Sequence, residues 1–236
     1  MSPSQWLLPS LTRLDWDGNC PFGLKSFVFV SRDQGRTWPE VHDVFDMWAD
    51  NIVTWEQKQC VLSDGRLLAI TWAFDDESKE NLPNQYALSD DLGASWLSPL
   101  ESPVLGQTCA PLALPNNRIL AVYRASPESG RRGLWATTAR IEGTDWVEEG
   151  EDFCLWGEEQ EVNHLPDERD LTGQLTSDTP ADGCVGQAMP GAKHSGITEM
   201  IALKFGFPQL IQLADGDVLV VFVSLSHHSV PLDVFS

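Results

Sequence analysis

Basic residues are scarce in this sequence: 15 lysines and arginines stand against 35 aspartates and glutamates, which gives a formal net charge of −20. A chain this acidic repels phosphate backbones and anionic lipid headgroups, so we expect neither nucleic acid nor a membrane as a partner. The net negative charge of the chain also repels any anionic ligand. Such a ligand therefore needs a local cluster of arginines to hold it.

Long apolar stretches are lacking too. No run approaches the roughly 20 apolar residues of a membrane-spanning helix, although 42% of the residues are hydrophobic, which excludes a disordered chain. The N-terminus has no charged region followed by a sufficient apolar stretch, so no signal peptide is visible. The localisation stays open: either the protein is cytoplasmic or its natural N-terminus is missing.

The marks of a metal centre are also lacking. The five cysteines have no metal-ligand spacing, and the pair His227-His228 has no His, Cys or Asp partner at such a spacing. We therefore expect reduced, partly buried thiols, no bound metal and no cofactor.

The clearest motif is an octamer that occurs twice, as SRDQGRTW at 31–38 and as SDDLGASW at 89–96. Strand-like residues precede the first copy at 26–30, so we predict a tight turn between two strands. The Asp accepts hydrogen bonds across the turn, the Gly takes a positive φ, and the Trp packs beneath. The residues assigned to the two turns are Ser31, Asp33, Gly35, Trp38, Ser89, Asp91, Gly93 and Trp96. A weaker third copy, ARIEGTDW at 139–146, has Ile141 in place of the Asp.

A second repeat has a different pattern. LSDGRLLAITW at 62–72 recurs as LPNNRILAVYR at 114–124 and as LADGDVLVVFV at 213–223. Each copy predicts a β-hairpin whose second strand is buried on both faces, with its turn at Asp64-Gly65, Asn116-Asn117 or Asp215-Gly216. The interval from 62 to 114 suits one four-stranded unit, and the interval from 114 to 213 is about twice as long.

The octamers are similar to the Asp-box repeats of the sialidase (neuraminidase) superfamily of β-propellers. That resemblance implies an all-β fold: a single but incomplete domain over residues 1–236, with about three to four blades of a six-bladed sialidase-type propeller. The chain would then be a fragment of that fold. Residues 157–200 are rich in Gly, Pro, Ser and acids, and we interpret them as an irregular insertion, with a hidden blade as the alternative.

In sialidases, three arginines hold the carboxylate of the sugar, a Glu activates a Tyr nucleophile, and an Asp is the acid/base. The resemblance assigns Glu56, before the first hairpin repeat, to the activating Glu, and Arg124, at the end of the second, to a carboxylate-binding arginine. Trp72 stands at the corresponding Arg position of the first repeat, and Thr108 at the corresponding Glu position of the second. We expect Glu56 and Arg124 to face a shared central depression, with Trp55 and Trp72 as apolar walls for a sugar ring.

Structural roles stay open for both charged residues. Glu56 can equally be an ordinary loop carboxylate, and Arg124 a strand-end arginine paired with an acid. Neither Tyr86 nor Tyr123 matches the nucleophile of the family. The candidates for the acid/base, among which no spacing decides, are Asp43, Asp46 and Asp50.

The resemblance implies an exo-acting glycoside hydrolase of the sialidase type, which releases terminal sialic acid or a related acidic sugar from a glycan or sialoglycoconjugate. The alternative is a non-catalytic propeller module that binds glycan or protein with the same face. Both stay open because a fold does not determine a function.

Overall fold

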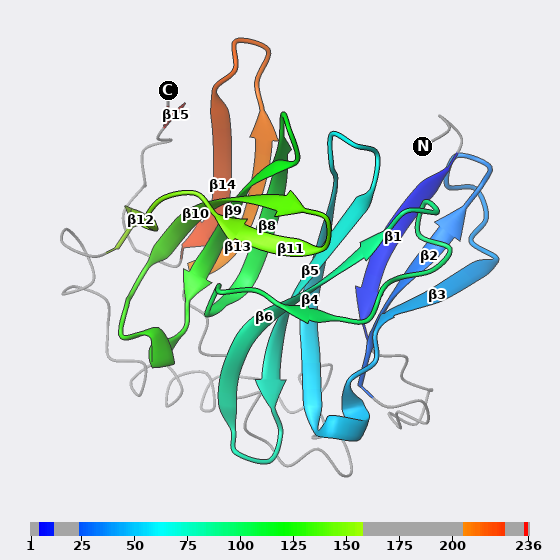
Figure 1. The fold of residues 1–236 in the computed structure, drawn as a ribbon, viewed down its shortest axis with the longest axis horizontal. Helices are drawn as coiled ribbons and strands as arrows, with labels where there is room; N and C mark the ends of the chain where they lie inside the picture. The colour runs from blue at the N-terminus through cyan, green and yellow to red at the C-terminus, as the bar shows by residue number, and fades with distance from the viewer. Residues whose placement is uncertain (1–4, 12–23, 158–204, 225–233, 236) are drawn as a thin grey trace, which may run out of the picture.

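The computed structural model describes residues 5–11, 24–157, 205–224 and 234–235, which form antiparallel strands and two short 3₁₀ helices. The strands belong to four sheets: in Figure 1 the blue first sheet lies at the right, the second lies in the middle, and the orange fourth sheet overlaps the green third sheet toward the upper left. The fold is all-β, as the sequence predicts. The described residues contain no helix that is long and apolar enough to cross a membrane. The insertion predicted at 157–200 lies, apart from Gly157, outside the described residues.

Each sheet is built from strands that are neighbours in the sequence. The first contains β1 (Trp6–Leu11), β2 (Ser26–Ser31) and β3 (Glu40–Phe45). The second contains β4 (Ile52–Val61), β5 (Leu67–Asp75), β6 (Glu80–Ser89) and β7 (Leu100–Glu101). The third contains β8 (Gly106–Leu114), β9 (Arg118–Ala125), β10 (Leu134–Glu142) and β11 (Asp145–Glu148), and β12 (Phe153–Trp156) also pairs with β10. The fourth contains β13 (Phe205–Gln212), β14 (Val218–Ser224) and β15 (Val234–Phe235). The 3₁₀ helices are η1 (Trp48–Asp50) and η2 (Pro127–Ser129).

All three predicted hairpins are present. β4 pairs with β5, β8 with β9, and β13 with β14, each pair antiparallel. The turns use the residues that tolerate a positive φ: Gly65 at 92°, Gly216 at 100°, and both asparagines, Asn116 at 62° and Asn117 at 54°. In Figure 1 the three hairpin turns point toward the top of the view.

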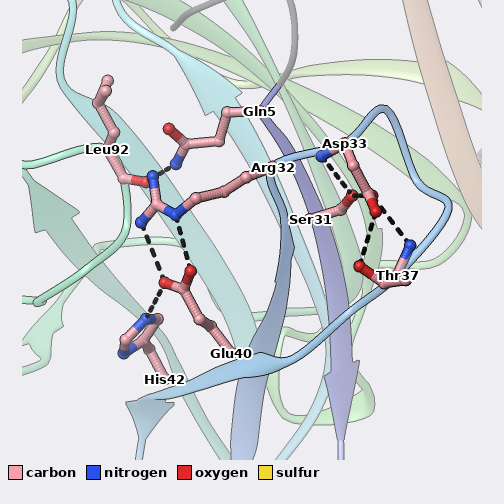
Figure 2. Close-up of polar contacts among 8 residues, drawn as sticks. All are labelled: Gln5, Ser31, Arg32, Asp33, Thr37, Glu40, His42 and Leu92. Carbon is pink, nitrogen blue, oxygen red and sulfur yellow. Dashed lines mark hydrogen bonds and ion pairs between the residues drawn. The ribbon is translucent and has the colours of Figure 1, made fainter.

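The two good octamers form the same turn, the first between β2 and β3 and the second between β6 and β7. In the first, Asp33 accepts hydrogen bonds from the Thr37 backbone N–H at 2.9 Å and from the Thr37 hydroxyl at 2.7 Å, and the Gly35 N–H donates to Ser31 Oγ at 2.8 Å. Figure 2 shows Asp33 between Ser31 and Thr37. These bonds, the side-chain bond from Thr37 first, lower the pKa of Asp33 to about 2.

The second octamer repeats these contacts. Asp91 accepts hydrogen bonds from the Ser95 backbone N–H at 2.8 Å and the Ser95 hydroxyl at 2.6 Å, and the Gly93 N–H donates to Ser89 Oγ at 2.9 Å. The pKa of Asp91 is likewise lowered to about 2, mainly by the hydroxyl of Ser95. The tryptophans differ. The Trp38 indole N–H donates to the Gly35 carbonyl at 3.1 Å, whereas that of Trp96 is buried without a hydrogen-bond partner among the described residues.

The first octamer is also tied to its surroundings (Figure 2). Arg32 makes a bidentate salt bridge with Glu40 on β3, with Nε 2.7 Å from Oε1 and Nη2 3.0 Å from Oε2. Gln5, just before β1, donates to the Leu92 carbonyl at 2.8 Å, which connects the first sheet to the second octamer. The second octamer turn therefore also joins neighbouring sheets.

The third octamer does not form this turn. Ile141 is 2% exposed within β10 and pairs with Trp146 of β11, so the chain reverses at Gly143-Thr144 in a short hairpin. The reason is chemical: without an Asp there is no acceptor to hold the longer turn, and burial of the Ile side chain favours continuation of the strand.

Apolar strand residues fill the space between adjacent sheets. One cluster, which includes Leu68, Ile70, Leu88, Ile119 and Ile141, joins the second and third sheets. A smaller one, which includes Val28, Val30, Phe45, Ala69 and Ala87, joins the first and second. The first strands of the last three sheets are neighbours, because β4 contacts β8 and β8 contacts β13.

The predicted burial of the hairpin strands holds for only part of the chain. Eight of the nine residues of β5 are buried, and β9 is buried through most of its length. For β14 the prediction is wrong: Val221 is 49% exposed and Val223 is 50% exposed. The fourth sheet is the last in the row, and no other sheet of the described residues packs against its outer face.

Candidate functional site

Three β-bulges lie at equivalent places in the first strands of the last three sheets. The pairing register shifts between Trp55 and Lys58 in β4, between Gln107 and Ala110 in β8, and between Gly206 and Gln209 in β13. The residues that follow the first bulge position all have positive φ, which is uncommon for non-glycine residues: Glu56 at 55°, Thr108 at 51° and Phe207 at 53°. A β-bulge changes the direction in which side chains point, and Glu56 lies within such a bulge.

The bulges are in contact with one another. The Phe207 N–H donates to Thr108 Oγ1 at 3.3 Å, which joins the fourth sheet to the third. Lys58 donates from its ammonium group to the Pro208 carbonyl, which joins the second sheet to the fourth. Gly206 fits against the same contact: a Cβ there would lie 3.2 Å from Thr108 Oγ1. These contacts bring three sheets together at one point.

Glu56 is partly buried at this point. Burial raises the pKa of its carboxyl group to about 7, and the positive charges of Lys58 and Arg124 oppose that rise. Its Oε2 atom is shielded from solvent and has no hydrogen-bond partner among the described residues. Glu56 is therefore a carboxyl group that can exchange protons near neutral pH.

Arg124 is 7% exposed near the end of β9, where it pairs with Gln107 of β8. Its charge acts on Glu56, so the two residues that the sequence singles out, from different repeats, lie within electrostatic range. Whether they face a common depression stays a prediction. The second cation, Lys58, belongs to no motif of the sequence, and it stands in a polar run of β4, EQKQ at 56–59, so no local pattern sets it apart. Burial lowers its pKa, and the negative charge of Glu56 opposes that shift.

The two tryptophans pack against each other beside the bulge of β4. The rings of Trp55 and Trp72 lie edge to face with centroids 4.6 Å apart. Trp72 is fully buried, and its indole N–H donates to Asn81 Oδ1 at 2.6 Å. Trp55 is partly buried, so of the two it is the one with surface to offer a ligand.

Asn81 links this region to the third sheet. Its amide donates to both carboxylate oxygens of Glu128 at 2.9 Å, and its oxygen also accepts from Gln107 at 3.2 Å. The pKa of Glu128 stays below its usual value although burial opposes this, because Asn81 donates to it. This network carries no sequence motif, and its members come from three separate segments.

Neither tyrosine is poised as a nucleophile. The Tyr123 hydroxyl donates to Asp152 at 2.8 Å, and burial together with this acid raises the pKa of the phenol. The Tyr86 hydroxyl donates to the Thr144 carbonyl at 2.8 Å, and its pKa is raised by burial. Both phenols are therefore held in the neutral form.

The acid/base candidates pair with another residue or lie exposed at the surface. Asp43 and Asp46 both pair with Lys25, and their side chains are 45% and 51% exposed. Asp50 is exposed in η1. Within the part of the chain that is described, no group of three or more His, Cys, Asp and Glu side chains is placed to hold a metal ion.

Comparison with known proteins bears on the fold. No family model and no curated protein matches the sequence. Among solved structures, the chain is similar to a protein of unknown function from Dyadobacter fermentans, with 18% identity and a TM-score of 0.51 over 92% of this chain and 45% of that one. It also matches the Hadza microbial sialidase Hz136, with 16% identity and a TM-score of 0.45 over 61% of this chain and 30% of that one. The first likeness concerns the fold alone, and the second is weaker still. The chain spans less than half the length of either structure.

Proposed function

We propose that the chain is part of a sialidase-type β-propeller, with about three to four of six blades in a single domain. Four antiparallel sheets in chain order, with their first strands as neighbours, support this arrangement, which is typical of propellers. The two octamer turns support it as well, because they share the same Asp-centred hydrogen bonds at the same kind of strand connection.

We further propose that the region of Glu56 and Arg124 receives a terminal acidic sugar of a glycan or sialoglycoconjugate. The observation that carries this proposal is the proximity of a partly buried carboxyl group with a pKa of about 7 to two cations, at a contact between bulges of three sheets. Arg124 offers the guanidinium group that a carboxylate prefers. Trp55 offers an apolar face to the sugar ring.

The leading activity is exo-acting hydrolysis that releases sialic acid or a related acidic sugar. In that role Glu56 would accept a proton from the attacking group. The alternative is a module that binds glycan or protein without catalysis, and the state of the tyrosines favours it: both hydroxyls are hydrogen-bonded elsewhere, and neither phenol is activated by Glu56 in the described geometry.

One pair of measurements on the unmodified protein separates these functions. Release of sialic acid from a chromogenic sialoside would support the hydrolase. Saturable binding of a sialylated oligosaccharide by calorimetry, without release, would support the binding module. If the protein neither binds nor cleaves acidic glycans at millimolar concentration, the proposed ligand class is wrong.

A further inference from the structure

We propose that Lys58 is a positioning residue of this site: it ties the bulge of β13 to β4 and supplies a second positive charge beside Glu56. The inference rests on the proposed function, because it gives Lys58 a part in the same site. It depends on the contact of the Lys58 side chain, in the second sheet, with the Pro208 carbonyl in the fourth.

Lys58 departs from the repeat to which it belongs. The three hairpins align through their bulges, so that Lys58 corresponds to Ala110 in β8 and to Gln209 in β13. Neither equivalent residue carries a charge. The lysine is therefore specific to the sheet that also contains Glu56, two residues away in the same bulge.

The geometry gives Lys58 two tasks at once. Its ammonium group donates to the Pro208 carbonyl, in a bulge where the regular ladder pairing is interrupted. Its charge also acts on Glu56 in the same strand, while Arg124 acts on Glu56 from β9. A partly buried ammonium group is costly unless its surroundings favour the charge, and here a carbonyl and a carboxylate do so.

The charges fit an acidic ligand. Lys58 and Arg124 place two positive charges within electrostatic range of Glu56, on a chain whose net charge is −20. A ligand carboxylate repelled by the overall field would find a local attraction at this point. The sequence predicted arginines for this purpose, and the structure supplies one arginine and one lysine.

The test measures the ionisation of Glu56 as a function of pH. Its carboxyl ¹³C resonance is monitored by NMR in the full chain without ligand. Lys58→Met keeps the length of the side chain and removes the charge that favours the carboxylate. The midpoint of the Glu56 titration should move from about 7 to about 8, at the lower end of what one close opposite charge produces. Lys58→Arg should restore it, because the charge returns. Lys79→Met is the matched control: Lys79 pairs with Asp76 at 2.6 Å, and its loss should leave the midpoint in place.

A second variant tests the same coupling if Lys58→Met does not fold. Glu56→Gln removes the carboxylate from the other side of the pair, so the ammonium ¹⁵N titration of Lys58 should move to lower pH. An unchanged Glu56 midpoint in a folded Lys58→Met protein would overturn the proposal, and so would an unchanged Lys58 titration in Glu56→Gln.

Ligand binding supplies a separate measurement. Affinity for free sialic acid should fall about tenfold in Lys58→Met and recover in Lys58→Arg. Equal affinity in the parent and in Lys58→Met would overturn the part assigned to Lys58 in ligand binding. Absence of binding in the parent would count against the proposed function, whereas the coupling between Lys58 and Glu56 would still be decided by the titrations.

Discussion

In the proposed site, Arg124 is the residue on which we expect recognition of an acidic sugar to depend most. It is 7% exposed, so a contact with a ligand carboxylate would be shielded from water. We expect Arg124→Ala to lose about 1.5–3 kcal/mol of binding free energy, or roughly tenfold to hundredfold in affinity for a sialylated oligosaccharide. Arg32→Ala, which removes an exposed arginine paired with Glu40, is the control and should bind as the parent does. Calorimetry that gives equal affinities for Arg124→Ala and the parent would exclude this site.

Turnover measurements test the proposed role of Glu56 as a proton acceptor. If it accepts a proton during hydrolysis, Glu56→Gln should keep the shape of the site and lower turnover by about 10²–10⁴. In the parent, turnover should rise with pH through about 7, because the carboxylate is the active form and burial raises the pKa of Glu56 to that value. A parent that cleaves a chromogenic sialoside as fast as Glu56→Gln does would remove Glu56 from the mechanism.

Glu56 also affects stability, in a direction that does not depend on function. Its pKa is about 7 in the folded chain and about 4.3 in the unfolded chain. Below pH 4 both states are protonated, and between about 4 and 7 the folded state holds the proton more tightly, so this residue makes the protein less stable as pH rises through that range. Glu56→Gln should therefore gain thermal stability relative to the parent from pH 4 to pH 8. A difference in melting temperature that is constant with pH would contradict the buried state of Glu56.

At the scale of elements, the octamer turns are held by one carboxylate each. Asp33→Ala and Asp91→Ala should each lower the melting temperature by a few degrees, because backbone and hydroxyl donors lose their acceptor. Asp90→Ala, which removes the exposed acid next to Asp91, is the control and should be neutral. The pKa of both turn aspartates is lowered to about 2, so their stabilisation is complete above about pH 4 and disappears as pH falls to 2. Melting curves with the same deficit at pH 2 and pH 7 would argue against these bonds.

The contact between the bulges of β8 and β13 depends on one hydroxyl group. Thr108 is fully buried, and its Oγ1 accepts from the Phe207 N–H. Thr108→Val keeps the shape but leaves that N–H without a protein acceptor, which we expect to cost about 1–3 kcal/mol. Hydrogen exchange at Phe207 should accelerate in the variant, and urea titration should report the loss. Protection at Phe207 equal to that of the parent would mean that the hydroxyl does not hold the fourth sheet.

At the scale of the whole molecule, one hydrophobic cluster contains residues of both the second and the third sheet. Ile119 of β9 is fully buried in a cluster that also contains Leu68 of β5 and Leu88 of β6. Ile119→Ala should therefore cost about 2–5 kcal/mol and increase hydrogen exchange in the facing strands of the second sheet, not only in β9. Ile211→Ala, at a position that is 57% exposed, should change stability by less than about 0.5 kcal/mol. Exchange that increases in the third sheet alone would show that the sheets unfold independently.

Local structure was largely determined by the sequence. Asp64-Gly65, Asn116-Asn117 and Asp215-Gly216 predict hairpins because few residues accept the backbone angles of these turns, and all three hairpins are present. The Asp, Gly and Ser or Thr of the two good octamers predict their turns for the same reason, since each donor and acceptor lies within four residues of its partner. Local chemistry of this kind is readable from a single segment.

Packing between distant segments was decided by the tertiary structure. The octamer at 139–146 becomes a short hairpin because Ile141 is buried between sheets, and β14 stays half exposed because it lies in the last sheet of the row. Lys58 reaches the Pro208 carbonyl 150 residues away. The role that we propose for it depends on three bulges that meet only when the sheets stand side by side. A contact between distant segments leaves no periodic pattern in either of them, so only the fold brings Lys58 to a bulge of the fourth sheet and Arg124 of β9 within electrostatic range of Glu56.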